Sequence, residues 1–246
     1  MNETLSLLYS HRSDRSFNDQ PVSDEALGSI LEAARRAPTS TNAQHVSTIV
    51  VRDAVKRACI AKIAGGQGWI ADAPVFIAVI LDFYKTAIGV EMAGEKQTVH
   101  ETVEGLLAGV TDAGIALATM IVAARSLGLG IVPIGGIRRN PQAMIDLLEL
   151  PPRSFPVVGL SIGHVDQPAC QKPRLPMQVF RHDERYHTEG IPEAIAAYDA
   201  ILLDHWKRIG RADGKAWSRN TAEAYQQLSR RQVKSVLEKQ GLTHDK

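Results

Sequence analysis

The sequence predicts a mixed α/β fold, built as one large domain with an appended C-terminal segment. Its 246 residues are about one and a half times the length of a typical domain. Hydrophobic residues make up 44% of the chain, enough for a continuous core that buries roughly 70–75% of the extended-chain surface. Segments with helical spacing of apolar residues alternate with short β-branched or continuously apolar runs.

The first half of the chain predicts a helix followed by two strands. Residues 24–36 repeat apolar side chains at helical spacing behind Ser23, a favoured N-cap residue, and Pro38 closes the helix. The segment 47–51 is rich in β-branched residues and is typical of a strand. The segment 75–81 is apolar throughout, as expected of a strand covered on both faces.

The centre of the chain predicts a long helix and then strand, helix and strand. Residues 103–127 are rich in Ala, Gly and Leu, and such small side chains let another backbone approach closely, as in a central packing helix. A strand at 131–134 leads through a glycine pair to a helix at 141–150, and a strand follows at 156–162. The order of elements is therefore mixed α/β.

The composition changes beyond Lys172. Several prolines precede two polar helical stretches, at 192–208 and 218–239. This segment has too few large apolar residues to fold by itself, so it packs either on its own domain or on a partner subunit. A polar extension with one apolar stripe fits a partner subunit better.

Charge and composition exclude several classes of protein. Lys and Arg total 28 against 27 Asp and Glu, a net charge of +1, so no long-range field favours DNA, RNA or an acidic membrane. The longest continuous apolar run, 75–81, is far short of the ~20 residues that span a bilayer. The N-terminus has no leader pattern, so we expect a cytoplasmic protein. Cys59 and Cys170 lack metal-ligand spacing, so we expect neither a disulfide framework nor a metal site.

A dense set of anion-binding side chains stands near the N-terminus, where His11, Arg12, Ser13, Asp14 and Arg15 follow one another. Guanidinium groups match phosphate oxygens bidentately, and a serine hydroxyl adds a short hydrogen bond. By spacing alone, a solvated basic helix end explains the same residues.

Two polar turns offer groups that can contact an organic ligand. Residues 38–44 place hydroxyl and amide side chains between a helix end and a strand. The turn at 65–68 contains Gln67, which supplies both a donor and an acceptor. Ordinary turn chemistry also explains each of them.

Two further motifs follow strands. Gly135 and Gly136 come directly after Pro133 and Ile134, and two residues without Cβ let main-chain N–H groups approach a flat ligand. The proline-bracketed loop 172–176 contains two cations and is by itself equally typical of a basic linker.

Signatures of other catalytic classes are missing from the sequence. The glycines at 128 and 130 follow a helix instead of a strand, and no third glycine completes a dinucleotide fingerprint. The chain shows no serine elbow, P-loop, His/Glu metal spacing or nucleophilic cysteine context. A bound organic cofactor would therefore have to supply the chemistry.

Taken together, five motifs resemble the FMN-dependent nitroreductase superfamily, and specifically its oxygen-insensitive NADPH nitroreductase and NADPH–flavin oxidoreductase branch (type A). The motifs are His-Arg-Ser-x-Arg at 11–15, the Ser/Thr-rich loop ending at Gln44, Gly-Gly-Gln at 65–67, Gly-Leu-Gly with Ile-Gly-Gly at 128–136, and Lys-Pro-Arg-Leu-Pro at 172–176. They occur in the family's order and approximate spacing and cover nearly the whole chain.

The resemblance implies an α+β fold, a three-layer sandwich with a central, mostly antiparallel sheet between helices. It also implies a homodimer with an FMN at each of two interface sites. On this basis residues 1–190 form the FMN-binding domain. Residues 191–246 form a helical C-terminal extension that packs on the dimer partner.

The resemblance also assigns FMN contacts by position. The residues expected to hold the phosphate are His11, Arg12, Ser13, Lys172 and Arg174. Arg15, the first catalytic candidate, is expected at the N1–C2=O edge of the flavin, where a fixed guanidinium stabilises the negative charge of the reduced ring. Gly135 is the second catalytic candidate. Either Gly135 or Gly136 is expected to donate a main-chain N–H to flavin N5, and Ile134 is expected to contact the FMN next to them. Thr39, Ser40 and Gln67 are expected at the ribityl chain or the pyrimidine edge.

The implied reaction is a ping-pong transfer of hydride from NADPH, with NADH as an alternative donor, through bound flavin to nitroaromatic, quinone or flavin acceptors. Arg208 matches an arginine that binds the NADPH 2′-phosphate in the family, whereas Asp213 stands where a second arginine is usual. In the acceptor pocket Pro133 replaces the usual Tyr and Asn42 the common Phe. We therefore expect a pocket less suited to stacking flat aromatic acceptors.

Two other functions remain open from the sequence. The first is a dedicated flavin reductase that supplies free reduced FMN to a partner enzyme. The second, from a different class, is a non-catalytic FMN-binding protein that acts as a store or a sensor.

Overall fold

Four strands form one antiparallel sheet, in the order β1–β2–β4–β3. The computed structural model describes residues 1–226 and 230–243. The strands are β1 (Val46–Val51), β2 (Val75–Asp82), β3 (Gly130–Ile134) and β4 (Ser154–Gly163). Each lies within a few residues of a predicted strand, and the antiparallel pairing confirms the sheet that the family resemblance implied.

β2 lies inside the sheet and contributes to two hydrophobic cores. Its residues alternate between the core of Ile77 and Val79, on the side of α6 (Val103–Ser126), and the core of Phe76 and Ala78, on the side of α7 (Pro141–Leu148). Successive side chains of a strand point to opposite faces, so a continuously apolar run requires cover on both sides. The prediction made from this run is confirmed.

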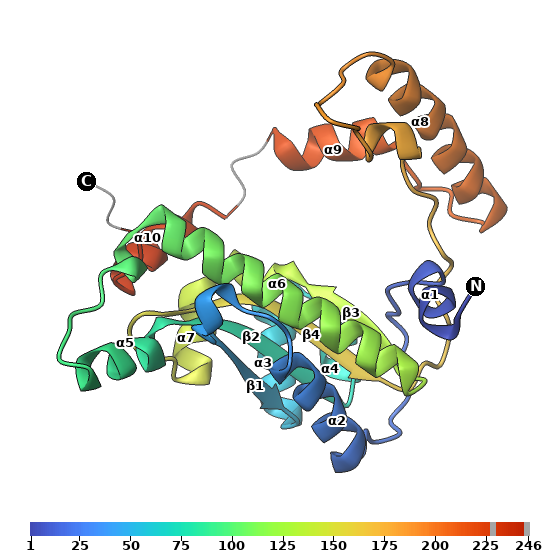
Figure 1. Cartoon of the computed structure of the whole chain (residues 1–246). Helices are drawn as coiled ribbons and strands as arrows, with labels where there is room; N and C mark the ends of the chain where they lie inside the picture. The colour runs from blue at the N-terminus through green and yellow to red at the C-terminus, as the bar shows by residue number, and fades with distance from the viewer. Residues whose placement is uncertain (227–229, 244–246) are drawn as a thin grey trace. The chain divides into compact units, whose positions relative to one another are not determined.

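Helices cover both faces of the sheet and complete a three-layer sandwich (Figure 1). One face carries α2 (Asp24–Arg35) and α6 (Val103–Ser126), and the other carries α3 (Ala54–Ile63), α4 (Trp69–Asp72) and α7 (Pro141–Leu148). The remaining helices before residue 164 are α1 (Glu3–Tyr9), α5 (Phe83–Met92) and the 3₁₀ helices η1 (Ser40–Asn42), η2 (Val99–Glu101) and η3 (Gly135–Arg139).

Side-chain caps explain where three of these helices begin. Ser23 accepts a hydrogen bond from the Ala26 N–H at the start of α2. Thr102 caps α6 in the same way, and Asn140 caps α7. Each cap pairs one of the main-chain N–H groups that a helix start leaves open.

The sequence did not predict α3 and α5. The sequence of α3 has no regular apolar stripe, and in the structure only Ile60 and Ala61 are buried along this helix. α5 begins directly where β2 ends, and Asp82 both closes the strand and accepts from the Lys85 N–H as the helix cap. No Gly or Pro marks this change of structure, so the usual boundary signal is missing.

α6 has an apolar composition along its whole 24-residue length. By length and composition alone it could cross a membrane, with a mean hydropathy of 1.9 over its most apolar window. The longest continuous apolar run in the sequence did not reveal it, because Glu104, Asp112 and Thr119 interrupt the apolar residues of this helix. It packs on the sheet through Ala113, Met120 and Ala124, as predicted for a central packing helix.

The contacts divide the chain into two compact units. The first comprises residues 1–169 and 230–246, and the second residues 170–229. The sequence placed the corresponding division at residues 190 and 191. α10 (Gln232–Lys239) belongs to the first unit, where Val236 and Leu237 join the core beneath α6. The expected packing of residues 191–246 on a dimer partner stays a prediction.

The second unit has a small core of its own. It contains η4 (Met177–Val179), α8 (Ile191–Arg208) and α9 (Trp217–Tyr225). Tyr198, Leu202 and Trp206 form its buried centre. The helix predicted at 218–239 is divided between α9 and α10, and its residues 227–229 lie outside the described part of the chain.

Candidate functional site

The segment 11–15 is anchored by Asp14, which is 2% exposed. The Asp14 N–H donates to the Ile131 C=O of β3 at 2.9 Å. Its Oδ1 accepts from the Arg12 Nε at 3.2 Å and from the Ala169 N–H at 3.0 Å. The carboxylate therefore ties the segment to β3 and to the chain after β4, while Arg15 beside it stays exposed.

Two guanidinium groups crowd at this anchor. Arg125, in the last turn of α6, donates to the C=O groups of Leu7 and Ser10 and so fixes the end of α1. Burial lowers the pKa of Arg125, the charge of Arg12 lowers it further, and Asp14 opposes the shift. Arg12 pairs with Asp14 and Arg125 lies within the field of both, so two cations face one carboxylate, an arrangement that attracts an anion such as a phosphate.

A glycine turn places Gln67 against η3. Gly65 and Gly66 have φ angles of +91° and +79°, a conformation open to glycine at no steric cost. Gln67 Nε2 donates to the Ala64 C=O at 2.8 Å. A Cβ on Gly136 would lie 2.3 Å from this Nε2 and 2.7 Å from the Ala64 carbonyl oxygen, so only glycine fits. The structure therefore brings two of the predicted FMN residues into contact.

Trp69, two residues after Gln67, extends this cluster to Arg15. The guanidinium carbon of Arg15 lies 5.4 Å from the centroid of the Trp69 ring, within cation–π range. Arg15 Nη1 also donates to the Ser13 C=O at 3.3 Å. The sequence analysis did not name Trp69 as a site residue. Its position next to the glycine turn at 65–68 could have indicated it.

Two arginines lie at the other side of the glycine pair. A Cβ on Gly135 would lie 3.5 Å from Arg138 Nη2 and 3.7 Å from Arg230 Nη2, which are ordinary contact distances. Burial lowers the pKa of Arg138, and the charge of Arg230 lowers it further. This surface favours a ligand that carries or gains negative charge. The sequence analysis missed both arginines, and Arg230 has no local signal because it is remote along the chain.

Pro133 and Ile134 lead into the glycine pair at the end of β3. Ile134 is 1% exposed and packs in the core on the side of α7, so only its main chain can contact a ligand. Pro133 pairs with Leu160 on an edge strand, where a residue without an N–H is tolerated.

The Ser/Thr-rich loop lies on the opposite face of the sheet, beside α6. The Ser40 N–H donates to Asp112 Oδ2 at 2.9 Å. The same oxygen lies 2.7 Å from His45 Nε2, and both side chains of this pair are 5% exposed. Asp112 therefore holds both ends of the loop against α6. The sequence offers no local sign of the pair, since its members are far apart along the chain.

The loop is held in an unfavourable backbone conformation. Thr41, Asn42 and Gln44 have φ angles of 50°, 55° and 52°, and such left-handed values cost a non-glycine residue about 1–2 kcal/mol. Asn tolerates this conformation better than Thr or Gln. Thr39 Oγ1 accepts from the Gln44 N–H at 3.2 Å, and with the Asp112 anchor this bond keeps the loop closed.

We expect Asp112→Ala to release the loop. The substitution leaves His45 and the Ser40 N–H without their shared partner, so the free energy of unfolding should fall by about 3 kcal/mol. Asp112→Asn keeps an acceptor for the Ser40 N–H and should lose less. Urea unfolding of the two variants measures the difference, and an unchanged midpoint for Asp112→Ala would contradict the anchoring role.

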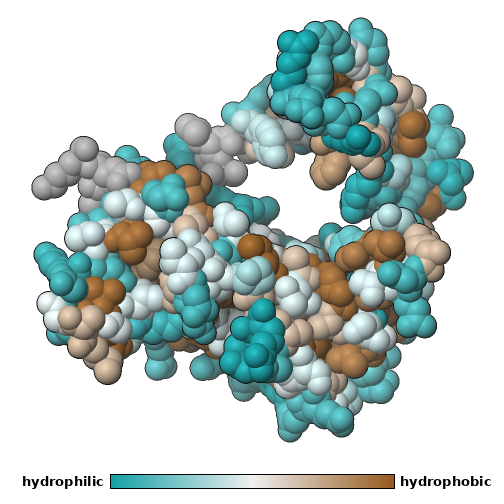
Figure 2. All heavy atoms as spheres, viewed as in Figure 1, coloured by the Kyte–Doolittle hydropathy of each residue, from teal (hydrophilic) through white to brown (hydrophobic). Residues whose placement is uncertain are grey.

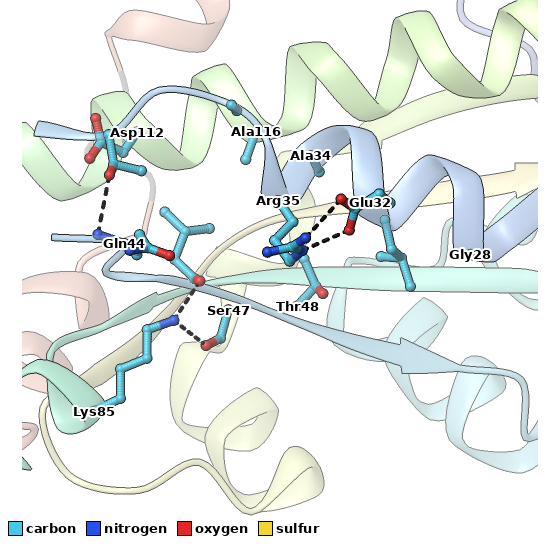
Figure 3. Close-up of a pocket in the computed structure, with 14 residues that line it drawn as sticks. Gly28, Glu32, Ala34, Arg35, Gln44, Ser47, Thr48, Lys85, Asp112 and Ala116 are labelled. Atoms are coloured by element: carbon cyan, nitrogen blue, oxygen red, sulfur yellow. Dashed lines mark hydrogen bonds and ion pairs between the residues drawn. The ribbon is translucent and has the colours of Figure 1, made fainter. Parts of the chain in front are cut away.

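A hollow of about 540 Å³ lies between this loop, α2 and β1 (Figure 3). Its charged side chains pair with neighbours: Arg35 bonds Glu32, and the Lys85 ammonium donates to the Val46 C=O at 2.7 Å. Thr39 lines the hollow, together with Gln44.

One chain therefore presents the predicted FMN residues in separate places. Arg15, Gln67, Gly135 and Gly136 lie with α4 and η3, on the side of the sheet covered by α7. Thr39, Ser40 and Asn42 lie beside α6, on the other side. The structure does not bring the two sets together within one chain.

Lys172, Arg174 and Arg208 belong to the second unit. They line one hollow of about 480 Å³, together with His205. The Lys172 ammonium lies 5.5 Å from the centroid of the Trp206 ring. The cations predicted for the FMN phosphate and for the NADPH 2′-phosphate are thus neighbours in a single basic hollow.

Comparison with known proteins places these motifs in a family. The Nitroreductase family model matches residues 8–164, and the model of that family's C-terminal domain matches residues 172–245. The FMN reductase (NAD(P)H) of Bacillus subtilis is 42% identical over 100% of each chain. The oxygen-insensitive NADPH nitroreductase of Salmonella typhimurium is 33% identical over 98% of each chain.

A solved structure agrees with the sequence comparison. The structure of NfrA2 from Bacillus megaterium matches with a TM-score of 0.97 at 41% identity, over 100% of each chain. This likeness confirms the three-layer fold around an antiparallel sheet. On the family models, the relatives and the fold together, this chain belongs to the nitroreductase family.

Proposed function

We propose that this protein is an FMN-dependent oxidoreductase that passes hydride from NADPH or NADH to nitroaromatic, quinone or flavin acceptors in two-electron steps. The observation that carries the proposal is that the segment from Gln67 to Trp69 contacts both Gly136, through Gln67, and Arg15, through Trp69. Two relatives support it by name, since one is called an FMN reductase and the other an NADPH nitroreductase.

The residues of this surface suit FMN. A Cβ on Gly135 would meet no atom closer than 3.5 Å, so its absence leaves room for a flat ring beside this main chain, whereas the missing Cβ of Gly136 lets Gln67 and Ala64 approach. Gln67 bonds Ala64 through its Nε2, so its carbonyl oxygen remains to accept from the ligand. The crowded guanidinium groups at Arg12 suit a phosphate that cannot be buried without partners.

The chain's own part in the reaction is to bind, orient and stabilise charge. FMN, when bound, supplies the exchange of a hydride with a nicotinamide or an acceptor. Arg15 would stabilise negative charge at the N1–C2=O edge of a bound flavin, and Gly135 or Gly136 would hold the ring by a main-chain N–H at N5. Lys172 and Arg174 would supply further positive charge for the phosphate, as their positions in the family motif imply.

We infer that the active form is a homodimer. The predicted FMN residues lie on both faces of the sheet in one chain, so a second copy could complete the set. A loop with Thr39 and Ser40 from one copy would then meet a flavin held by Gln67 and Gly136 of the other.

The reduced nicotinamides that the enzyme uses are cytoplasmic metabolites, so we place it in the cytoplasm.

α6 offers the surface for that contact. Leu107 and Val110 are 58% and 41% exposed, and Gly114 and Ala118 continue the exposed stripe at helical spacing. Figure 2 shows brown and pale residues over this face of the first unit. Small residues at a helix crossing let two helices approach closely, so we propose that α6 packs against its copy.

The donor site is built for weak discrimination between nicotinamides. Arg208 Nε lies 3.1 Å from Asp204 Oδ2, and both side chains are exposed. Asp213, at the position of the family's second arginine, pairs with Arg211 at 3.1 Å. Arg208, the cation that matches the 2′-phosphate position, is thus already partly paired. NADPH preference should therefore be modest, in line with a relative named for NAD(P)H.

Arg208→Ala should raise KM for NADPH roughly two- to fivefold, because an exposed ion pair contributes about 1 kcal/mol or less. KM for NADH should hardly change, since NADH carries no 2′-phosphate. Steady-state kinetics with both donors measures this, with Arg219→Ala as an exposed arginine control on α9. Equal effects on both donors would contradict the assignment.

The acceptor pocket should favour acceptors that do not depend on aromatic stacking. Pro133 and Asn42 both lack the aromatic rings usual at their positions in this branch. Steady-state assays across nitrofurans, quinones and FMN test this, and nitrofurans as the best acceptors would refute it.

A dedicated flavin reductase is the second candidate function, and the name of the Bacillus subtilis relative favours it. Such an enzyme would turn over FMN far faster than any quinone.

The visible spectrum of the purified protein tests the whole proposal. We expect flavin absorbance in the isolated protein, and bleaching of that absorbance when NADPH or NADH is added without oxygen. A protein that binds FMN but stays oxidised would be a store or a sensor. A colourless protein that takes up no FMN would refute the proposal.

A further inference from the structure

Arg15 is an exposed side chain that contacts few groups of its own chain. Its Nη1 donates to the Ser13 C=O at 3.3 Å, which is long for a hydrogen bond. The face of the Trp69 indole, 5.4 Å from the guanidinium carbon, is the second contact. A guanidinium is attracted to an aromatic face, so Trp69 restricts where Arg15 lies.

Trp69 is itself held in place by the fold. It is the first residue of α4, and its ring packs against the core on the side of α7. The Ile70 N–H donates to the Gln67 C=O at 3.1 Å, which links α4 to the glycine turn. Packing on the core therefore holds the ring beside the glycine turn, and the exposed guanidinium of Arg15 lies over its face.

We propose that Trp69 is the positioning residue for Arg15, and that through Arg15 it sets the reduction potential of the bound flavin. The inference rests on the proposed function. A guanidinium that is already in place stabilises the reduced flavin without first having to reorient. An arginine that must reorient stabilises it less, because the reorientation costs free energy. Trp69 also supplies an aromatic surface in a site whose positions 42 and 133 carry none.

The Trp69 indole N–H makes a clean substitution possible. This nitrogen is buried and has no hydrogen-bond partner among residues 1–226 and 230–243. Removing a buried donor that makes no bond costs the fold little. Trp69→Phe keeps an aromatic face for Arg15 while it removes the N–H and the five-membered ring of the indole, so it tests whether an aromatic face alone suffices.

The test is a redox titration of holoenzyme carrying Trp69→Leu, Trp69→Met, Trp69→Phe, Arg15→Ala or Arg15→Ala with Trp69→Leu. We expect the Leu and Met variants to lower the midpoint potential in the same direction as Arg15→Ala, and the Phe variant to stay near wild type. The Leu and Met variants should also weaken FMN binding roughly three- to tenfold. Tyr225→Leu, at an aromatic side chain that is 84% exposed, should change neither quantity.

The double variant distinguishes positioning from a merely structural role. If Trp69 acts through Arg15, Trp69→Leu should add nothing to the shift that Arg15→Ala produces. An additive shift, or an unchanged potential in both the Leu and Met variants, would overturn the inference and leave the proposed function standing. A wild-type protein that takes up no FMN would overturn both. Methionine adapts to irregular space in a core, so the Trp69→Met variant provides the test if the Trp69→Leu variant fails to fold.

Discussion

Gly114→Arg should convert the protein into a monomer that purifies without FMN. Gly114 lies on the exposed stripe of α6, and a Cβ there would meet no atom of its own chain within 4 Å. The arginine therefore leaves the isolated chain intact. In a dimer it would bury an unpaired charge at a close helix contact, which costs several kcal/mol, and two-fold symmetry doubles that cost.

Size-exclusion chromatography with absorbance at the flavin band measures both effects. The matched control is Gly89→Arg on α5, where a Cβ would also meet nothing within 4 Å. That variant should stay dimeric and yellow. A yellow dimer with Gly114→Arg would show that α6 is not the dimer face. A yellow monomer would show that one chain alone makes the flavin site.

Gly136→Ala should damage both the fold and the flavin site, whereas Gly135→Ala should damage only the flavin site. The Gly136 methyl would lie 2.7 Å from the Ala64 carbonyl oxygen, a backbone atom, and 2.3 Å from Gln67 Nε2. Such overpacking costs about 1–3 kcal/mol. The Gly135 methyl would make only ordinary contacts, the nearest at 3.5 Å, so the apoprotein should unfold as wild type does.

Thermal unfolding of the apoproteins and FMN titrations separate these outcomes. Both variants should bind FMN at least tenfold more weakly, a loss of about 1.4 kcal/mol or more, because the added methyl displaces the flavin from the main chain at Gly135 and displaces Gln67 at Gly136. Wild-type FMN affinity in Gly135→Ala would rule out the approach of the flavin to that N–H. Wild-type stability in Gly136→Ala would show that the glycine turn can move.

Local sequence patterns were enough to predict most helices and strands of the three-layer sandwich. The continuous apolar run of β2 and the small-residue pattern of α6 predicted elements that the structure confirms within a few residues. The motif order pointed to Arg15, Gln67 and the glycine pair, which the structure places together. α3 and α5 were missed, because one has little apolar periodicity and the other begins without a breaker.

The supporting residues could not be predicted, because their roles depend on partners far away in the chain. Asp112 holds Ser40 and His45 from 72 and 67 residues away. Trp69 supports Arg15 across 54 positions. No local pattern distinguishes these side chains from ordinary polar or aromatic residues, so sequence analysis passed over them.

The sequence by itself determined the family, the elements of the sandwich and the residue types that suit FMN, because periodicity and motif spacing record interactions between near neighbours. Only the tertiary structure decided that the predicted FMN residues divide between two faces of the sheet, and that Trp69 lies beneath Arg15. The physical reason is that contacts between distant segments arise from packing against the shared sheet, which no single stretch of sequence specifies.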